Sequence, residues 1–155
     1  MPDQPPATGA TTGDSTGDAP DRPRRTVITF GTFDVFHVGH LRVIERAAAL
    51  GDRLVVGVSA DALNLRKKGR EPVFSQSERL EIVAALKPVH EVFVEERLEL
   101  KRDYILRFGA DVLVMGDDWA GRFDEFNDIC EVVYLTRTPA ISTTALIEKI
   151  SGSSL

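Results

Sequence analysis

The chain has 155 residues, of which 43% are hydrophobic and 28% charged, and its formal net charge is −5. This length suits one domain with its own core, and the composition is typical of a soluble globular protein. The negative charge argues against nucleic acid as a partner, and no apolar run approaches the roughly 18–20 residues that span a bilayer. A single cysteine, Cys130, excludes a disulfide framework and fits a reducing cytoplasm.

Residues 1–25 differ sharply in composition from the rest of the chain. They hold five of the eight prolines and three of the twelve glycines, and they contain no aromatic residue. Such a segment buries too little apolar surface to offset the entropy lost on ordering, so we expect a disordered tail. It has no apolar core like that of a secretory signal. The predicted folded domain is therefore 26–155.

From residue 26 onward, short apolar runs alternate with segments of helical character. The runs predict strands at 26–31, 53–59, 91–94, 111–115 and 131–135. Helices are predicted at 39–50, 76–86, 101–108 and 143–151. Runs that are apolar throughout are typical of strands buried on both faces of a parallel sheet. The alternation predicts an α/β fold, with a doubly wound, Rossmann-like parallel sheet of about five strands.

Local signals support three of these helix boundaries. Gly51 and Gly109 each follow a predicted helix, at the position where a left-handed residue commonly ends one. Ser75 and Glu78 have the spacing of a capping box, in which each side chain binds the backbone N–H of the other residue. A helix is therefore expected to start directly after Ser75.

Ligands of open α/β sheets bind at the carboxyl ends of the strands, and four polar segments are expected there. The first, 31–40, places His37 and His40 where a strand passes into a helix N-terminus, whose free N–H groups and dipole favour anions. The others are a basic loop at 61–70, the segment 115–119, and the segment 137–144. In the last, an arginine precedes three hydroxyl residues at a helix start, which is a second place for a phosphate. Two anion sites and a basic loop suit a polyphosphate.

Several segments match a known superfamily. His37-Val38-Gly39-His40, together with 31–34 and with Ile141-Ser142-Thr143-Thr144, resembles the nucleotidyltransferases with HxGH and ISTT-type motifs. Within that superfamily, segments 64–67, 114–123 and 130–138 resemble the glycerol-3-phosphate cytidylyltransferase family, whose GDDW motif matches 116–119. The resemblance covers essentially all of residues 26–151.

The resemblance implies that an acceptor phosphate attacks the α-phosphorus of CTP and releases pyrophosphate, giving CDP-glycerol from glycerol 3-phosphate. The catalytic residues it implies are His37, His40, Lys67 and Arg137. The nucleotide-binding residues it implies are Gly31, Thr32, Phe33, Asp34, Gly39, Lys87, Asp118, Trp119, Thr138, Ile141, Ser142, Thr143 and Thr144. Lys67 and Lys101 would bind the acceptor. Mg²⁺ would accompany the CTP phosphates without a dedicated protein site, and the enzyme would be a cytoplasmic homodimer serving cell-envelope synthesis.

Some of these residues also have plainer interpretations. Two histidines three positions apart could ligate a metal, although no third ligand stands out. The threonine run could simply cap a helix, Lys68 could act in place of Lys67, and Trp119 could be a core or dimer contact. Arg79 could form a salt bridge, and His90 reads as a surface residue.

Two positions depart from the family pattern, and other functions stay open. Ala140 stands where relatives have glycine, and Lys87 stands where they have arginine, which keeps the charge but loses the bidentate fork. These changes are compatible with catalysis and concern the identity of the acceptor. The alternatives are an adenylyltransferase acting on a flavin or a sugar phosphate, and a non-catalytic nucleotide-binding protein. Class I aminoacyl-tRNA synthetases share the HxGH motif, but the chain is too small and too acidic for one.

Overall fold

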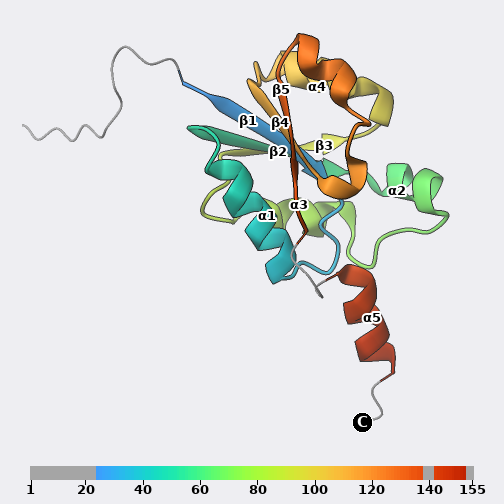
Figure 1. Ribbon diagram of the computed structural model, residues 1–155. Helices are drawn as coiled ribbons and strands as arrows, with labels where there is room; N and C mark the ends of the chain where they lie inside the picture. The colour runs from blue at the N-terminus through green and yellow to red at the C-terminus, as the bar shows by residue number, and fades with distance from the viewer. Residues whose placement is uncertain (1–23, 138–141, 153–155) are drawn as a thin grey trace, which may run out of the picture.

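Five parallel strands form one sheet in the order β3-β2-β1-β4-β5 (Figure 1). The computed structural model describes residues 24–137 and 142–152. The strands are β1 (Thr26–Gly31), β2 (Arg53–Ser59), β3 (Glu91–Glu95), β4 (Val112–Gly116) and β5 (Glu131–Leu135). Every pairing is parallel. The predicted doubly wound sheet is confirmed, with β3 one residue longer than expected and β4 displaced by one residue.

Helices cover both faces of the sheet (Figure 1). The α-helices are α1 (Val38–Ala48), α2 (Asp61–Lys68), α3 (Gln76–Ala84), α4 (Lys101–Arg107) and α5 (Thr143–Ser151). Short 3₁₀ helices occupy η1 (Leu98–Leu100), η2 (Asp117–Trp119) and η3 (Asp124–Asp128). None of these helices is long and apolar enough to cross a membrane, as far as the described ranges go.

The core has two halves, one on each face of the sheet. On one face α1 and α3 pack through Ile44 and Val83 against Val27. On the other face α4 packs through Ile105 against Ile28. Because Val27 and Ile28 are neighbours in β1 and both are fully buried, the strand has no solvent face, which explains its continuous apolar run.

The order of the strands reverses between β1 and β4, and this position determines where a ligand can bind. The chain leaves β1 toward α1 and β2 on one side, while β4 is followed by β5 on the other. Connections that diverge from two neighbouring strands leave a crevice at the strands' carboxyl ends. Gly31 and Gly116 end the two strands that flank this crevice.

Two local expectations were wrong. The segment 61–70 is not a loop, because Asp61–Lys68 forms α2, which ends at Gly69 with a φ of +74°. Gly51 does not take the left-handed conformation; it is small because a Cβ there would lie 2.6 Å from the carbonyl oxygen of Arg25. Gly109, with a φ of +61°, behaves as expected, and so does the capping box of Ser75 and Glu78. The tail predicted for 1–25 lies outside the described residues, apart from its last two.

Candidate active site

His37 and His40 form the capping box of the helix they begin. His37 is the N-cap of α1, and its Nδ1 accepts a hydrogen bond from the Gly39 N–H at 3.0 Å. The Nδ1 of His40 accepts from the His37 N–H at 3.2 Å. The two rings stack with their centroids 3.9 Å apart. Because each Nδ1 acts as an acceptor, the ring proton of a neutral histidine lies on Nε2, which remains available to donate to a ligand.

Both histidines are uncharged at neutral pH. The pKa of His40 is lowered to about 4, mainly by burial; the charges of His37 and Arg137 contribute to this shift and Asp34 opposes it. Burial also lowers the pKa of His37. The pair therefore presents hydrogen-bond donors to the crevice without adding net positive charge.

The turn between β1 and α1 is strained and firmly held. Phe33 and Val35 have φ angles of +54° and +49°, a region that β-branched Val35 rarely occupies. The carboxylate of Asp34 holds the turn, accepting hydrogen bonds from the backbone N–H groups of Val73 at 2.7 Å and Phe74 at 2.8 Å. Strain of this kind is concentrated at ligand-binding sites.

The N-terminus of α5 is attached to the same turn. Thr143 donates its hydroxyl hydrogen to the carbonyl oxygen of Asp34 at 3.0 Å, and its oxygen lies 3.4 Å from Nε2 of His37. Ser142 is the N-cap and accepts from the Ala145 N–H. The two hydroxyl residues thus have different roles: Ser142 caps α5, while Thr143 holds the start of α5 beside His37.

Three adjoining cavities make up the cleft at this edge of the sheet. The nucleotide chamber, as we call the one beside the histidines, has a volume of about 310 Å³ and is lined by His37, His40, Arg137, Ser142 and Thr143 among others. The deep chamber has a volume of about 410 Å³ and is lined by Ser59, Lys67, Glu95 and Lys101 among others. The two chambers share Phe30, Gly31, Thr32, Lys68, Asp118, Trp119 and Arg137.

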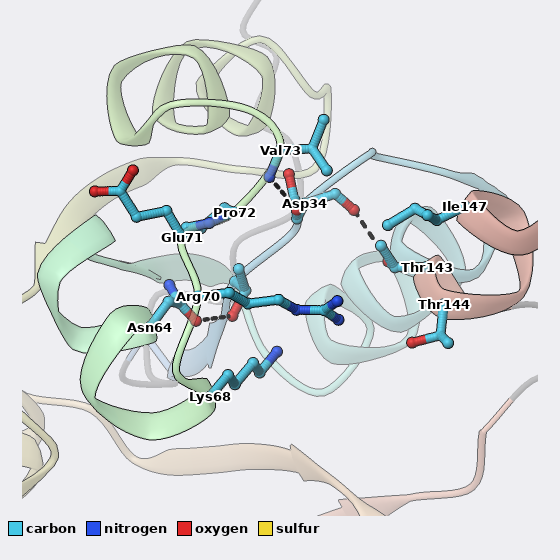
Figure 2. Close-up of a pocket in the computed structure, with 11 residues that line it drawn as sticks. Asp34, Asn64, Lys68, Arg70, Glu71, Pro72, Val73, Thr143, Thr144 and Ile147 are labelled. Atoms are coloured by element: carbon cyan, nitrogen blue, oxygen red, sulfur yellow. Dashed lines mark hydrogen bonds between the residues drawn. The ribbon is translucent and has the colours of Figure 1, made fainter. Parts of the chain in front are cut away.

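The third cavity, of about 200 Å³, lies between α2 and α5. Figure 2 shows the Lys68 ammonium and the Arg70 guanidinium pointing into it, with Thr143 and Thr144 on the opposite side. Of the two adjacent lysines, Lys68 lines all three cavities, whereas Lys67 lines only the deep chamber. Both lysines therefore line the cleft.

The deep chamber ends in a buried ion pair. The ammonium of Lys101 lies 2.6 Å from Oε2 of Glu95, and each side chain is 2% exposed. Burial lowers the pKa of Lys101, and the carboxylate of Glu95 opposes that shift. Burial of its ammonium likewise lowers the pKa of Lys67, although the residue is exposed to solvent. Lys67 and Lys101, which the sequence assigned to the acceptor, thus line one chamber.

Arg137 and Asp118 face each other across the wall shared by the two chambers. Their closest atoms are 3.5 Å apart and both side chains are largely exposed, so the pair is weak. Trp119 is half-buried; it packs against Phe123 in one half of the core and also lines both chambers. A ligand phosphate can therefore bind Arg137 in place of Asp118, because little free energy is lost when this weak ion pair breaks.

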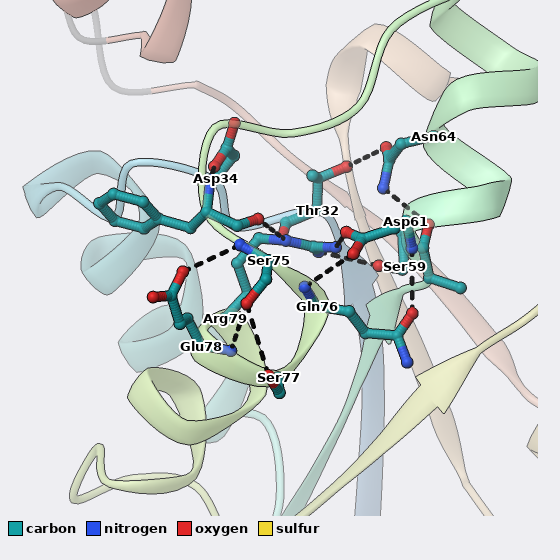
Figure 3. A network of polar contacts seen from close by, with 12 residues as sticks. Thr32, Asp34, Ser59, Asp61, Asn64, Ser75, Gln76, Ser77, Glu78 and Arg79 are labelled. Atoms are coloured by element: carbon teal, nitrogen blue, oxygen red, sulfur yellow. Dashed lines mark hydrogen bonds and ion pairs between the residues drawn. The ribbon is translucent and has the colours of Figure 1, made fainter.

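Arg79 is the important residue of this edge that the sequence did not assign to the site. Its side chain is fully buried and donates to the carbonyl oxygens of Thr32, Ser59 and Phe74, with a salt bridge of 2.7 Å to Asp61. Figure 3 shows the guanidinium among these groups. It joins the ends of β1 and β2, the start of α2 and the loop before α3. The salt bridge that the sequence allows for Arg79 is present, and the same side chain also joins the elements around the cleft.

Some predicted site residues are not brought to the cleft. Lys87 lies in the turn that precedes β3, so strand polarity places it at the amino edge of the sheet, opposite His37. Its assignment to nucleotide binding therefore finds no support in the geometry of the described chain. Thr138, Ile141 and the departure at Ala140 lie outside the described residues.

The cytidylyltransferase-like family matches residues 28–153 of the chain. This protein is a member of that family. The cytidylyltransferase-like chain is 48% identical over 128 residues to a glycerol-3-phosphate cytidylyltransferase from Bacillus subtilis. The aligned region covers 83% of this chain and 98% of that protein. A glycerol-3-phosphate cytidylyltransferase from Bacillus spizizenii is 45% identical over 122 residues, covering 79% of this chain and 94% of that protein.

A solved structure supports the fold of this cytidylyltransferase-like domain. The lipopolysaccharide core biosynthesis protein from Thermoplasma volcanium aligns with a TM-score of 0.64 at 22% identity, covering 75% of this chain and 99% of that one. At this identity the match bears on architecture alone. It agrees with the doubly wound sheet.

Proposed function

We propose that the protein transfers the cytidylyl group of CTP to glycerol 3-phosphate, forming CDP-glycerol and pyrophosphate. The observation that carries this proposal is the pair of chambers that share a wall. One is lined by two neutral histidines and the N-terminus of α5, and the other by Lys67 and Lys101. Two substrates that must meet at one phosphorus atom need this arrangement. The curated relatives supply the identity of the substrates.

In this mechanism CTP occupies the nucleotide chamber with its α-phosphate near the shared wall. The Nε2–H groups of His37 and His40 donate to phosphate oxygens as negative charge develops on them. Arg137 and the backbone N–H groups at the start of α5 hold the β- and γ-phosphates, which depart as pyrophosphate. Such donors stabilise a transition state that needs little covalent help from the protein.

The acceptor approaches from the deep chamber. Its phosphate carries two negative charges, so it lies toward Lys67 and Lys68 rather than against the carboxylate of Glu95. From there a phosphate oxygen attacks the α-phosphorus opposite the leaving pyrophosphate. Each lysine offsets the repulsion between the two phosphates, which is the main barrier to their approach.

Mg²⁺ would travel with the triphosphate. Among residues 24–137 and 142–152 there is no group of three or more histidine, cysteine or acidic side chains that could hold a metal ion. The phosphate oxygens of CTP are hard ligands of the kind Mg²⁺ prefers, and the ion would neutralise charge on the leaving group. This role for Mg²⁺ stays a prediction, as do the homodimer, the cytoplasmic location and a place in cell-envelope synthesis.

A substrate screen tests the proposed function. Pyrophosphate release is measured with CTP, ATP, GTP and UTP, each combined with glycerol 3-phosphate, a sugar 1-phosphate or flavin mononucleotide. Selective release with CTP and glycerol 3-phosphate is expected. Preference for ATP with the flavin or the sugar phosphate would favour the alternative transferases, and binding of CTP without turnover would favour a non-catalytic protein.

A further inference from the structure

We infer that Glu95 is a specificity-determining residue, whose carboxylate accepts a hydrogen bond from a hydroxyl group of the acceptor. The inference rests on the proposed function and extends it to a residue that the sequence did not single out. The uncharged end of the acceptor would lie beside Glu95 and Lys101 at the buried end of the deep chamber. The phosphate would lie at the other end, beside the wall shared with the nucleotide chamber.

The position of Glu95 is the first reason. It is the last residue of β3, so it lies at the carboxyl edge of the sheet, paired with Ser59 at the end of β2. The residue is 1% exposed, yet it lines the deep chamber together with Lys101 and Ser59. A buried carboxylate in the wall of a cavity is costly to desolvate and often serves a ligand.

The hydrogen bonding of Glu95 is the second reason. A carboxylate has about four acceptor positions. Lys101 occupies one on Oε2 at 2.6 Å, while the contact of Oε1 with the Ser59 hydroxyl is 3.5 Å long and therefore weak. Oε1 thus keeps acceptor capacity beside the cavity.

The pairing with Lys101 explains why a hydroxyl fits better than an ion. A hydroxyl group both donates and accepts a hydrogen bond, and Glu95 and Lys101 provide an acceptor and a donor side by side. Lys101 also lies 3.8 Å from the centre of the Phe30 ring, which fixes the ammonium in place. The pair has little net charge, so it attracts neither a second phosphate nor a free carboxylate strongly.

The charge distribution along the chamber sets the direction in which the acceptor binds. Lys68 lies in the shared wall, where the α-phosphate of CTP is expected, Lys67 lines the deep chamber, and the neutralised pair lies at the buried end. A three-carbon acceptor with a phosphate at one end and hydroxyl groups at the other matches this order. An acceptor without hydroxyl groups would leave Oε1 of Glu95 desolvated and poorly paired, which is a strong basis for rejection.

The test compares two acceptors with three proteins. Glycerol 3-phosphate and n-propyl phosphate have the same carbon chain, but only the first has hydroxyl groups. The value of kcat/KM for each is measured at saturating CTP in the wild type, in Glu95→Gln and in Glu96→Gln. Glu96 is the exposed neighbour whose side chain lines none of the three cavities, so it controls for the loss of one carboxylate on this segment.

The wild type is expected to prefer glycerol 3-phosphate by about 10- to 100-fold, the range of a hydrogen bond to a charged group. Glu95→Gln should reduce this preference about tenfold, and Glu96→Gln should leave it unchanged. An equal loss with both acceptors would indicate a merely structural role and overturn the inference.

Three further outcomes are decisive. If Glu95→Gln does not fold, as judged by circular dichroism, the wild type alone tests the inference: equal use of n-propyl phosphate and glycerol 3-phosphate would contradict it. A wild type that releases no pyrophosphate with glycerol 3-phosphate contradicts the proposed function, and the inference then falls with it. Activity with glycerol 3-phosphate but an unchanged preference in Glu95→Gln contradicts the inference alone.

Discussion

His40 accepts the backbone N–H of His37 through Nδ1, at 3.2 Å, while the two rings stack with centroids 3.9 Å apart. The motif therefore supplies its own helix cap, and the cap fixes which ring nitrogen faces the ligand. A helix start, a tautomer and two aligned donors thus follow from four consecutive residues. The fold itself thus fixes the arrangement of donors that the proposed mechanism uses.

Replacing His40 tests whether this donor stabilises the transition state. We expect His40→Ala to lower kcat about 10²- to 10³-fold, as for other preorganised donors to a developing charge. His90→Ala is the matched control, because Nδ1 of His90 also accepts a backbone N–H, from Leu54 at 3.0 Å, but at the amino edge of the sheet. Steady-state kinetics should show little change for His90→Ala. A His40→Ala enzyme with full activity would refute the proposed mechanism.

The lowered pKa of His40 predicts a loss of stability in acid. Its pKa is about 4 in the folded protein against 6.5 for an ordinary histidine. Between these values the unfolded chain binds more protons, so this contribution is complete above about pH 6.5 and is lost as the pH falls toward 4. Urea unfolding across this range should show a weaker pH dependence in His40→Ala than in the wild type. Identical pH profiles would contradict the assignment.

Arg79 should be essential for the stability of the cleft. Arg79→Met removes the donor to three carbonyl oxygens and to Oδ1 of Asp61, and we expect a loss of about 3–5 kcal/mol in the free energy of unfolding. Arg102→Met is the control, since Arg102 pairs with Asp128 on the exposed surface and should change stability little. Urea unfolding measures both. Equal losses in the free energy of unfolding for the two variants would show that the buried network stabilises the protein no more than an exposed ion pair does.

The sequence predicts the sheet well because buried parallel strands carry an unambiguous pattern. Three of the five strands have the predicted bounds, since continuous apolar runs such as 53–59 end at polar or glycine residues. The helix at 61–68 was missed because it is short and strongly polar, with little apolar periodicity. The basic last turn followed by Gly69 is a helix-ending signal that could have identified it.

The residues of the candidate site also fall into two groups, those that the sequence predicts and those that only the packing reveals. The histidines, Arg137, Thr143 and the lysines were predictable because motifs of fixed spacing carry them. Arg79 and Glu95 were not, because a charged residue on a helix or at the end of a strand normally faces solvent. Only the packing of α3 and α4 against the sheet shows that both are buried and that Glu95 lines the deep chamber.

Thr143 gives a test of how α5 is held beside the histidines. Thr143→Val removes the hydroxyl that bonds the Asp34 carbonyl and faces His37, and we expect kcat/KM for CTP to fall about tenfold. Thr143→Ser keeps the hydroxyl and should retain most of the activity. The two variants are compared by initial rates of pyrophosphate release. Equal activities in Thr143→Val and Thr143→Ser would mean that the hydroxyl is not used.

In the proposed mechanism the cytidylyl group passes from one chamber to the other within this cleft. The most direct measurement is a single-turnover reaction of CTP, labelled at the α-phosphate, with glycerol 3-phosphate and excess enzyme. The label is expected to appear in CDP-glycerol at the rate at which pyrophosphate forms, and only when glycerol 3-phosphate is present. Label appearing in CMP, or pyrophosphate forming equally fast without the acceptor, would contradict it.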